Sequence, residues 1–513
     1  MKKPNPAKDL YKELRKNSCE ELWAEVGRFN EGDQNERADR VALLRAVGVV
    51  FSESGSVEEK AQARAWLLGL LNDPVEKIRR YAMAALPKLS SGPNEEAALV
   101  ALLRTSELER EKSFLGKALN KIGGEAALEA LGGNLLQQNE QKIRANIARA
   151  KSPSVIQLDP ALADFAGLRI HLRGRKGLEK LVAEEVEESI SRTGKFKILK
   201  VSSGLVALEP LKAFSLSDIY SLRCFGTLGM VLGVVDGVNQ EELIETIAAV
   251  IASKVSLGIL ETFTQGSLRY RLELMGKGIA KGAVRAIADR AYALCPTILN
   301  DAQSAPWAME VRPVGTGFAI ELRPRLTPDP RLAYRKMDIP AASHPPLAAC
   351  MVRLAGRKDG EIVWDPFCGS GLELVERAIF GGVRALYGTD RSEDAISIAL
   401  SNFSAAGLGE IQTEFSCCDF RDFEGVKGLG PNTVTLLITN PPLGKRIPIP
   451  NLRGMIEDLF RVASTVLRPG GRLVFANPFR MESPCADLKL KYREIVDFGG
   501  FNCRLEKYVK TAR

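Results

Sequence analysis

The stretch Val434-Thr435-Leu436-Leu437-Ile438-Thr439-Asn440-Pro441-Pro442-Leu443 decides the fold of this chain. Its apolar first part predicts a buried parallel strand. Two prolines cannot continue a strand, because proline lacks the N–H group and fixes its own backbone. The chain therefore turns at the carboxyl end of a strand, where open α/β sheets bind their ligands. The Asn440 side-chain oxygen and the Pro441 carbonyl would both accept hydrogen bonds there, and could hold an NH2 group with its lone pair toward an electrophile. An isolated Asn-Pro-Pro is as often a plain structural turn.

An alternating series of strands and helices surrounds this turn. We expect strands at 361–365, 383–389, 413–416, 434–439 and 472–476, with helices at 372–380, 393–405 and 455–467. Arg468-Pro469-Gly470-Gly471 would close the last helix, and 492–496 and 502–508 read as a terminal hairpin. A parallel sheet that ends in an antiparallel hairpin differs from the dinucleotide-binding pattern and matches the Rossmann-like α/β fold of class I S-adenosylmethionine-dependent methyltransferases.

The first strand-to-helix turn has the sequence Asp365-Pro366-Phe367-Cys368-Gly369-Ser370-Gly371. Its two glycines let the backbone pass close to a ligand, and the helix N-terminus offers free N–H groups to a carboxylate. Asp365 would accept from an α-ammonium group, so the turn suits a methionine zwitterion. Leu374 stands where a dinucleotide-binding loop has its third glycine, which argues against NAD.

Two further acids follow at the ends of the next strands. Asp390, with Arg391 beside it, ends the second strand about twenty residues past the glycine loop, at the position where an acid binds ribose hydroxyls. The alternative for Asp390 is an acid at a helix N-cap. Asp419 would accept from an adenine amino group with Phe420 and Cys418 beside the ring, and Asp422 competes for that role.

Together, Asp365–Gly371, Asp390, Asp419 and Asn440-Pro441-Pro442 resemble the THUMP-domain-containing class I RNA methyltransferases that methylate the exocyclic N2 of guanine. The resemblance implies S-adenosylmethionine as methyl donor, tRNA or rRNA as partner, and a base flipped from its stack into the pocket. It also implies that Asn440, Pro441, Pro442 and Leu443 form the catalytic turn, which acts mainly by aligning the amine.

The chain departs from the family pattern at two positions. Leu443 stands where the family usually has Tyr or Phe, whose ring stacks on the flipped base and contributes roughly 1–3 kcal/mol. Phe479, after the fifth strand, could substitute for it. Leu372 stands where the family commonly has Thr. Lys445 and Arg446, directly after the turn, would hold a phosphate.

Residues 162–338 resemble a THUMP-type RNA-binding region. A strand at 168–172 and a helix at 177–186 open it, and basic residues collect in it, including Arg173, Arg175 and Lys176. Further basic clusters lie at 269–271, 277–281 and 323–325. Basic residues beside Gly and Tyr suit phosphate contact and base stacking. Each cluster alone is more often a solvated face, but their concentration in one region favours RNA.

Residues 1–155 have a helical pattern with almost no strand signal. Asp73-Pro74 followed by a small-residue helix resembles a HEAT-type repeat, with weaker echoes at 111–115 and 142–146, and residues 151–160 read as a linker. A repeat array would offer a docking surface for protein or RNA. The alternative is a plain α-helical bundle. A third domain, 342–513, carries the methyltransferase pattern.

Composition bounds the remaining possibilities. A chain of 513 residues is expected to form several domains, and a net charge of +8 suits a polyanionic partner without requiring one. Nine scattered cysteines without a Cys-x-x-Cys pair indicate a reducing compartment, and two histidines exclude a histidine-rich metal site. Without an apolar leader or a bilayer-length run, we expect a cytoplasmic protein with no membrane partner. The oligomeric state is not predicted.

Two alternatives to guanine-N2 methylation stay open. The same turn serves other NH2 acceptors, adenine N6 or a protein glutamine, because all present a planar amine. In the second alternative, the chain is a non-catalytic RNA-binding scaffold with a methyltransferase-like domain. The absence of an aromatic residue at Leu443 favours this alternative.

Overall fold

The computed structural model describes residues 6–89, 92–131, 142–144, 146–147, 153–237, 239–276, 278–280, 282–339, 343–444 and 449–512. The chain divides into two compact units. Unit 1 combines residues 1–155 with 235–318, and unit 2 combines 156–234 with 319–513. The predicted central region, 162–338, is thus shared between them. The predicted domain boundaries stay predictions.

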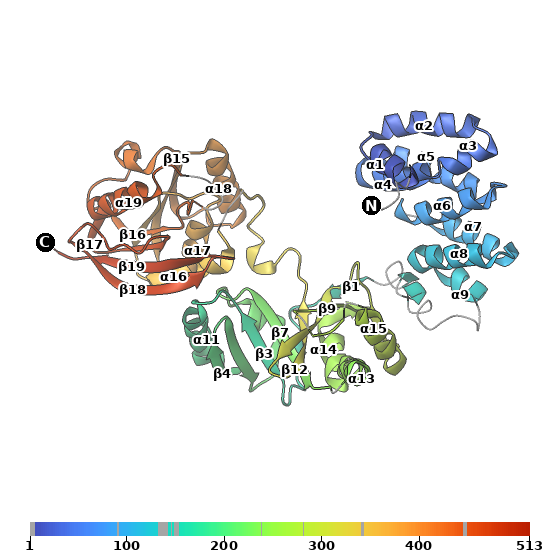
Figure 1. Ribbon diagram of the computed structural model, residues 1–513. Helices are drawn as coiled ribbons and strands as arrows, with labels where there is room; N and C mark the ends of the chain where they lie inside the picture. The colour runs from blue at the N-terminus through green and yellow to red at the C-terminus, as the bar shows by residue number, and fades with distance from the viewer. Residues whose placement is uncertain are drawn as a thin grey trace. The chain divides into compact units, whose positions relative to one another are not determined.

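Unit 1 begins with helices, and its described residues before Ser154 contain no strand (Figure 1). The helices are α1 (Pro6–Leu14), α2 (Cys19–Glu31), α3 (Gln34–Asp39), α4 (Ala42–Ser54), α5 (Val57–Gly69), α6 (Glu76–Ala85), α7 (Pro93–Thr105), α8 (Glu109–Ile122) and α9 (Glu125–Leu131). Capping boxes such as Ser18 with Glu21 and Ser56 with Glu59 satisfy free N–H groups at helix starts. Helices α4, α6 and α8 pack in succession, and each buries one apolar face in a shared core.

The rest of unit 1 is mixed. Its elements are α13 (Gln240–Ile251), α14 (Lys254–Phe263), β8 (Thr264–Gly266), β9 (Leu268–Leu274), α15 (Ala283–Leu294), β10 (Ile298–Asn300) and β11 (Trp307–Val314). Strand β9 pairs in parallel with both β10 and β11. Within the described residues no single helix has the length and apolarity to cross a bilayer; α13 and α14, bent by 43° at their junction, meet that test only as a pair and only by length and composition.

Unit 2 opens with an antiparallel sheet. Its elements are β2 (Ala161–Leu162), β3 (Arg169–Arg173), α11 (Glu179–Thr193), β4 (Phe196–Ser202), β5 (Leu205–Pro210), β6 (Phe214–Ser215), α12 (Leu216–Tyr220), β7 (Thr227–Val235) and β12 (Gly317–Pro324). Strand β3 pairs antiparallel with β5 and β7. Its Ile170 and Leu172 are buried, while Arg169, His171 and Arg173 are more exposed, as the alternating sequence predicts. The strand predicted at 168–172 and the helix predicted at 177–186 are confirmed as β3 and α11.

The C-terminal part of unit 2 is a Rossmann-like α/β domain. Its elements are α16 (Pro345–Ala355), β13 (Glu361–Asp365), α17 (Leu372–Phe380), β14 (Val383–Asp390), α18 (Glu393–Ala405), β15 (Gln412–Cys417), β16 (Val434–Thr439), α19 (Leu452–Val466), β17 (Leu467–Asn477), β18 (Leu488–Asp497) and β19 (Asn502–Lys510). The sheet order is β15-β14-β13-β16-β17-β19-β18. Strands β13 to β17 pair in parallel, and β19 runs antiparallel to β17 and β18. The predicted parallel sheet with a terminal hairpin is confirmed.

Two details differ from the sequence prediction. The Arg468–Gly471 segment, expected to close a helix as a loop, lies inside β17, where the pairing with β16 shifts register. Gly470, with φ of +76°, accommodates the irregularity. Part of the predicted linker, Ser154–Ile156, forms strand β1, because Val155 and Ile156 are β-branched and favour extended backbone.

Candidate active site

The donor loop and the Asn-Pro-Pro turn follow two neighbouring strands. Strand β13 lies between β14 and β16, and Val363 and Trp364 pair in parallel with Leu436 and Leu437. The carboxyl ends of β13 and β16 therefore lie at the same edge of the sheet, where the strand order reverses. Such a switch point is where open α/β sheets place a ligand.

The donor loop depends on two glycines with left-handed backbone. Gly369 has φ of +51° and Gly371 has φ of +80°. A Cβ atom would lie 2.9 Å from Ile339 Cδ1 at the first position and 3.2 Å from Ala399 Cβ at the second. Larger side chains are thus excluded by both conformation and space. Gly371 caps the N-terminus of α17, so free N–H groups point into the loop.

Two acids hold the loop from its two sides. Asp365 is fully buried, and its Oδ1 accepts from the N–H of Phe367 at 3.0 Å. Asp390 accepts from the N–H of Gly369 with Oδ2 and from the N–H of Ser392 with Oδ1, each at 3.0 Å. Each carboxylate has about four acceptor positions, which leaves Asp390 capacity for ribose hydroxyls. Burial raises the pKa of Asp365 well above its usual value, so a bound cation nearby would be stabilising.

The predicted adenine side is built from aromatic rings and one acid. Phe420 is buried, and its ring centroid lies 4.8 Å from that of Phe367. Asp419 caps the short helix that follows, accepts from the N–H of Arg421 at 3.0 Å, and pairs with the Arg421 guanidinium. Arg391 lies 3.9 Å from Asp419 and is largely exposed. The glycine loop, the two acids and this apolar wall fit a methionine–adenosine donor. The individual roles in donor binding stay predictions.

Asn440 ends β16 in a half-buried position with an unsatisfied acceptor. Its Nδ2 donates to Ser343 Oγ at 2.8 Å. Its Oδ1 is buried and has no hydrogen-bond partner within the described structure. Pro441 is buried, and Pro442 and Leu443 are half-buried. Gly444, with φ of +71°, turns the chain tightly against Leu452. The turn therefore presents an acceptor of the kind that the sequence predicted.

The predicted RNA contacts lie in different settings. Phe479 is half-buried and packs against the same apolar core as Phe367, and its N–H donates to Asn477 Oδ1 at 3.0 Å. Lys445 and Arg446 lie outside the described residues, as do Lys277 and Lys281 of one upstream basic cluster. Leu443 has no aromatic side chain to offer a base.

Arg173, Arg175 and His344 line a cavity of about 260 Å³. Both Nη atoms of Arg173 donate to the buried Glu321, at 2.5 and 2.7 Å, and Arg175 donates to the carbonyl of Asp497 at 2.9 Å. Lys176 is exposed. The two arginines are thus held in fixed positions beside His344, the residue that follows Ser343.

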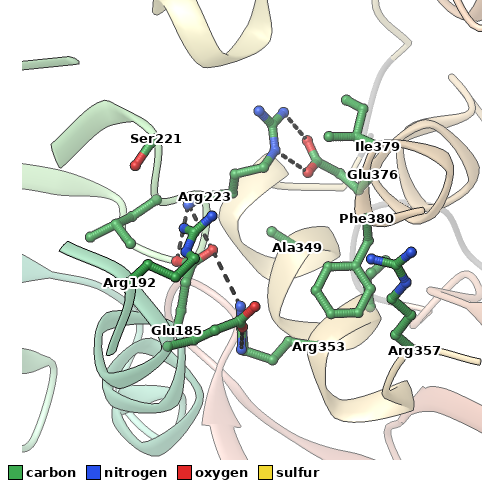
Figure 2. Close-up of a pocket in the computed structure, with 13 residues that line it drawn as sticks. Glu185, Arg192, Ser221, Arg223, Ala349, Arg353, Arg357, Glu376, Ile379 and Phe380 are labelled. Atoms are coloured by element: carbon green, nitrogen blue, oxygen red, sulfur yellow. Dashed lines mark hydrogen bonds and ion pairs between the residues drawn. The ribbon is translucent and has the colours of Figure 1, made fainter. Parts of the chain in front are cut away.

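A cavity of about 460 Å³ lies elsewhere in unit 2, beside the C-terminal ends of α16 and α17 (Figure 2). Arg223 and Glu376 point toward each other there and form two hydrogen bonds, at 2.6 and 2.8 Å. Arg353 lies 2.9 Å from Glu188. Glu376 lies in the middle of α17, and its ion pair with Arg223 links the antiparallel sheet region to the methyltransferase domain.

Sequence reasoning missed two polar residues at the site. Ser343 accepts from Asn440 and donates to Glu373 Oε1. Glu373 is 3% exposed in the first turn of α17, which is otherwise mostly apolar. The sequence signal for Glu373 was an acidic residue in a mostly apolar helix that is expected to be buried against the central sheet. Ser343 left no signal, because it lies 97 residues before Asn440.

Comparison with known proteins agrees with this geometry. A family model described as "RMKL-like, methyltransferase domain" matches residues 332–484. The chain is 33% identical over 134 residues to the "Probable tRNA (guanine(10)-N2)-dimethyltransferase" of Methanothermococcus thermolithotrophicus, covering 26% of this chain and 78% of that protein. It is 32% identical over 149 residues to the tRNA (guanine(10)-N2)-dimethyltransferase of Methanocaldococcus jannaschii, covering 29% and 41%.

A third relative, the U6 snRNA (guanine-N(2))-methyltransferase THUMPD2 of Bos taurus, is 31% identical over 144 residues, which cover 28% of this chain and 27% of that protein. The chain thus spans less than half the length of the second and third relatives. The crystal structure of TrmN from Thermus thermophilus matches with a TM-score of 0.53 and 22% identity, over 67% of this chain and 99% of that one. This likeness shows a shared fold.

The matched segment contains the glycine loop, Asp390, Asp419 and the Asn-Pro-Pro turn. These are the residues that the structure brings to one edge of the sheet. The chain therefore belongs to the RMKL-like methyltransferase family, UPF0020, which uses S-adenosylmethionine and whose relatives above carry the names of RNA guanine-N2 methyltransferases.

Proposed function

We propose that this protein transfers a methyl group from S-adenosylmethionine to the exocyclic N2 of a guanine in RNA, with tRNA or rRNA as the substrate class. The observation that carries the proposal is the buried Oδ1 of Asn440, which has no hydrogen-bond partner among the described residues. An unsatisfied buried acceptor costs about 1–3 kcal/mol, and an N–H of the target amine would satisfy it. The tRNA and U6 snRNA guanine-N2 methyltransferase names of the relatives support both the RNA and the atom.

The methyl donor supplies an electrophilic carbon on a sulfonium. Asn440 Oδ1 and the Pro441 carbonyl accept the two N–H groups of the guanine amine, so its lone pair points toward the donor loop. One N–C bond forms, one S–C bond breaks, and the nitrogen then releases a proton to water. Because the amine is already nucleophilic once aligned, the residues act mainly by orientation.

Donor binding falls to the loop and the two acids. The N–H groups at the start of α17 would hold the donor carboxylate, and Asp390 would hold the ribose hydroxyls. Asp419 and the Phe367–Phe420 pair would hold the adenine. The fixed glycine backbone would hold the donor with its methyl group toward Asn440.

The target base would be flipped into the pocket without the usual aromatic clamp. Leu443 offers only apolar contact, and Phe479 is the aromatic side chain that we propose to take over stacking. Arg175, Lys176 and the cavity beside His344 would contact phosphates next to the flipped nucleotide. Arg173, whose guanidinium is bound by Glu321, would add positive charge and rigidity.

We further propose that residues 162–338 form a THUMP-like RNA-binding region. The helices before residue 132 would form a HEAT-like docking surface for RNA or protein. The successive packing of α4, α6 and α8 supports repeat stacking. We also propose a cytoplasmic location, which suits nine scattered cysteines that form no disulfide in the described structure.

Two other functions would use the same fold. An adenine N6 or glutamine amide also presents an NH2 group to Asn440 and Pro441. A non-catalytic scaffold would bind RNA and leave the donor unused. The test is incubation of the purified full chain with methyl-labelled donor and hypomodified total RNA, followed by nucleoside digestion and mass spectrometry. We expect labelled N2-methylguanosine; donor binding without label in RNA would overturn the proposal.

A further inference from the structure

A chain of two hydrogen bonds runs behind the catalytic turn. Asn440 Nδ2 donates to Ser343 Oγ at 2.8 Å, and Ser343 Oγ donates to Glu373 Oε1. The three residues come from three different places: the end of β16, the segment before α16, and the first turn of α17. Asn440 Oδ1, on the other side of the amide, is the acceptor that the reaction uses.

The charge on Glu373 gives this chain a direction. An ionised carboxylate has no proton and can only accept a hydrogen bond. Ser343 has a single hydroxyl proton, and when that proton goes to Glu373, the serine oxygen can only accept from Asn440. The amide must then present Nδ2 to Ser343 and Oδ1 to the target amine.

A neutral Glu373 removes the direction. Its carboxyl O–H can donate to Ser343 Oγ, and the serine proton becomes free to donate to the asparagine. The amide can then turn over so that Oδ1 faces Ser343 and Nδ2 faces the target. In that orientation an N–H donor meets the N–H groups of the guanine amine, and productive alignment is lost.

We propose that Ser343 and Glu373 are positioning residues that fix which end of the Asn440 amide faces the acceptor amine, and that protonation of Glu373 releases this control. The inference rests on the proposed function of the turn as an amine-methylating site. It assigns to the site a pH dependence that the guanine amine itself, which does not titrate near neutrality, would not give.

The surroundings of Glu373 determine its pKa and therefore the pH range in which activity should change. Burial is the largest cause that raises its pKa, to about 7, while the Ser343 hydroxyl and the backbone N–H lower it and Glu376 on the same helix raises it. Glu373 and Asp390, at the end of β14, both repel the carboxylate of Asp365 at the end of β13 and raise its pKa. Arg377, on the same helix, is bound to Glu361. Control by Glu373 is therefore present above about pH 7 and released below it.

The experiment compares kcat across pH 5.5 to 8.5 for wild type, Glu373→Gln, Ser343→Ala and Ser343→Thr. We expect wild-type kcat to rise roughly tenfold across this range, as one ionisation of this kind allows. Glu373→Gln and Ser343→Ala should stay near the wild-type acid level at every pH. Ser343→Thr keeps the hydroxyl and should restore the rise. Donor affinity, measured by calorimetry with S-adenosylhomocysteine, should change little in all of them.

Ser221→Ala is the matched control and should keep the wild-type profile, because the Ser221 hydroxyl donates to the Asp218 carbonyl, away from Asn440 in the described structure. Thermal melting of each variant checks that it is folded. A rise that survives in Ser343→Ala would overturn the inference, because it would then come from Asp365 or another group. An inactive wild type with bound donor would instead overturn the proposed function.

Discussion

Gly371→Ala tests whether the donor loop works through the shape of its backbone. Gly371 has φ of +80° and ψ of 13°, the left-handed region, where an alanine costs about 1–2 kcal/mol. The new Cβ would lie 3.2 Å from Ala399 Cβ and 3.4 Å from Ala399 Cα, so the helix α18 must yield slightly. The protein relieves this strain by moving the loop away from its donor-binding shape.

Gly194→Ala is the matched control. Gly194 has φ of +61° and ψ of 21° at the C-terminus of α11, and its new Cβ would meet only the end of the flexible Lys212 side chain, at 3.1 Å. Both variants should therefore melt lower by about 2–8 °C, since 1 kcal/mol corresponds to about 2–4 °C in a unit of this size. The backbone cost is the same in kind at the two positions.

Only Gly371→Ala should weaken donor binding. If the bound loop must regain the strained shape, affinity falls by the same 1–2 kcal/mol, or about 5- to 30-fold. Calorimetry with S-adenosylhomocysteine measures this directly on the full chain. An equal loss of affinity in Gly194→Ala, or an unchanged affinity in a destabilised Gly371→Ala, would refute the role of the loop backbone.

Three further outcomes are expected. Asn440→Ala should lower kcat about 100-fold, because one preorganised contact to the reacting group is worth about 3 kcal/mol; a parallel loss of donor affinity would argue against an orienting role. Arg223→Leu should cost about 3 kcal/mol in chemical denaturation, since it strands the Glu376 carboxylate, which is 2% exposed, and Arg223→Leu with Glu376→Leu should recover most of that loss. Glu373→Gln should be more stable than wild type at pH 8 but not at pH 4.5. The folded-state pKa of Glu373 is raised from 4.5 to about 7, so wild type loses stability as pH rises through that window; equal stability at both pH values would contradict the raised pKa.

The central strands of the methyltransferase sheet were predictable because they are buried on both faces. Val434–Thr439 and Glu361–Asp365 are short apolar runs bounded by turn residues, and the structure has both strands with the predicted bounds. The helix Leu372–Phe380 is also as predicted. Its glycine start fixes the boundary.

Strand register and contacts between distant residues were not predictable from the local sequence. The bulge at Arg468–Gly471 depends on the register between β17 and β16. The sequence of this segment is typical of a turn and does not indicate that register. Ser343 reaches Asn440 only through the fold, and Asp390 proves to bind the loop N–H of Gly369. Contacts between residues distant in the chain are thus what the structure adds to the site.

Nucleoside analysis of RNA methylated by the purified chain is the most direct test of the central claim. Hypomodified RNA would be incubated with methyl-labelled S-adenosylmethionine, digested, and separated by mass spectrometry, with Asn440→Ala run beside wild type. The account predicts label in N2-methylguanosine for wild type and about 100-fold less for the variant. Label in N6-methyladenosine, or equal label from the two proteins, would contradict it.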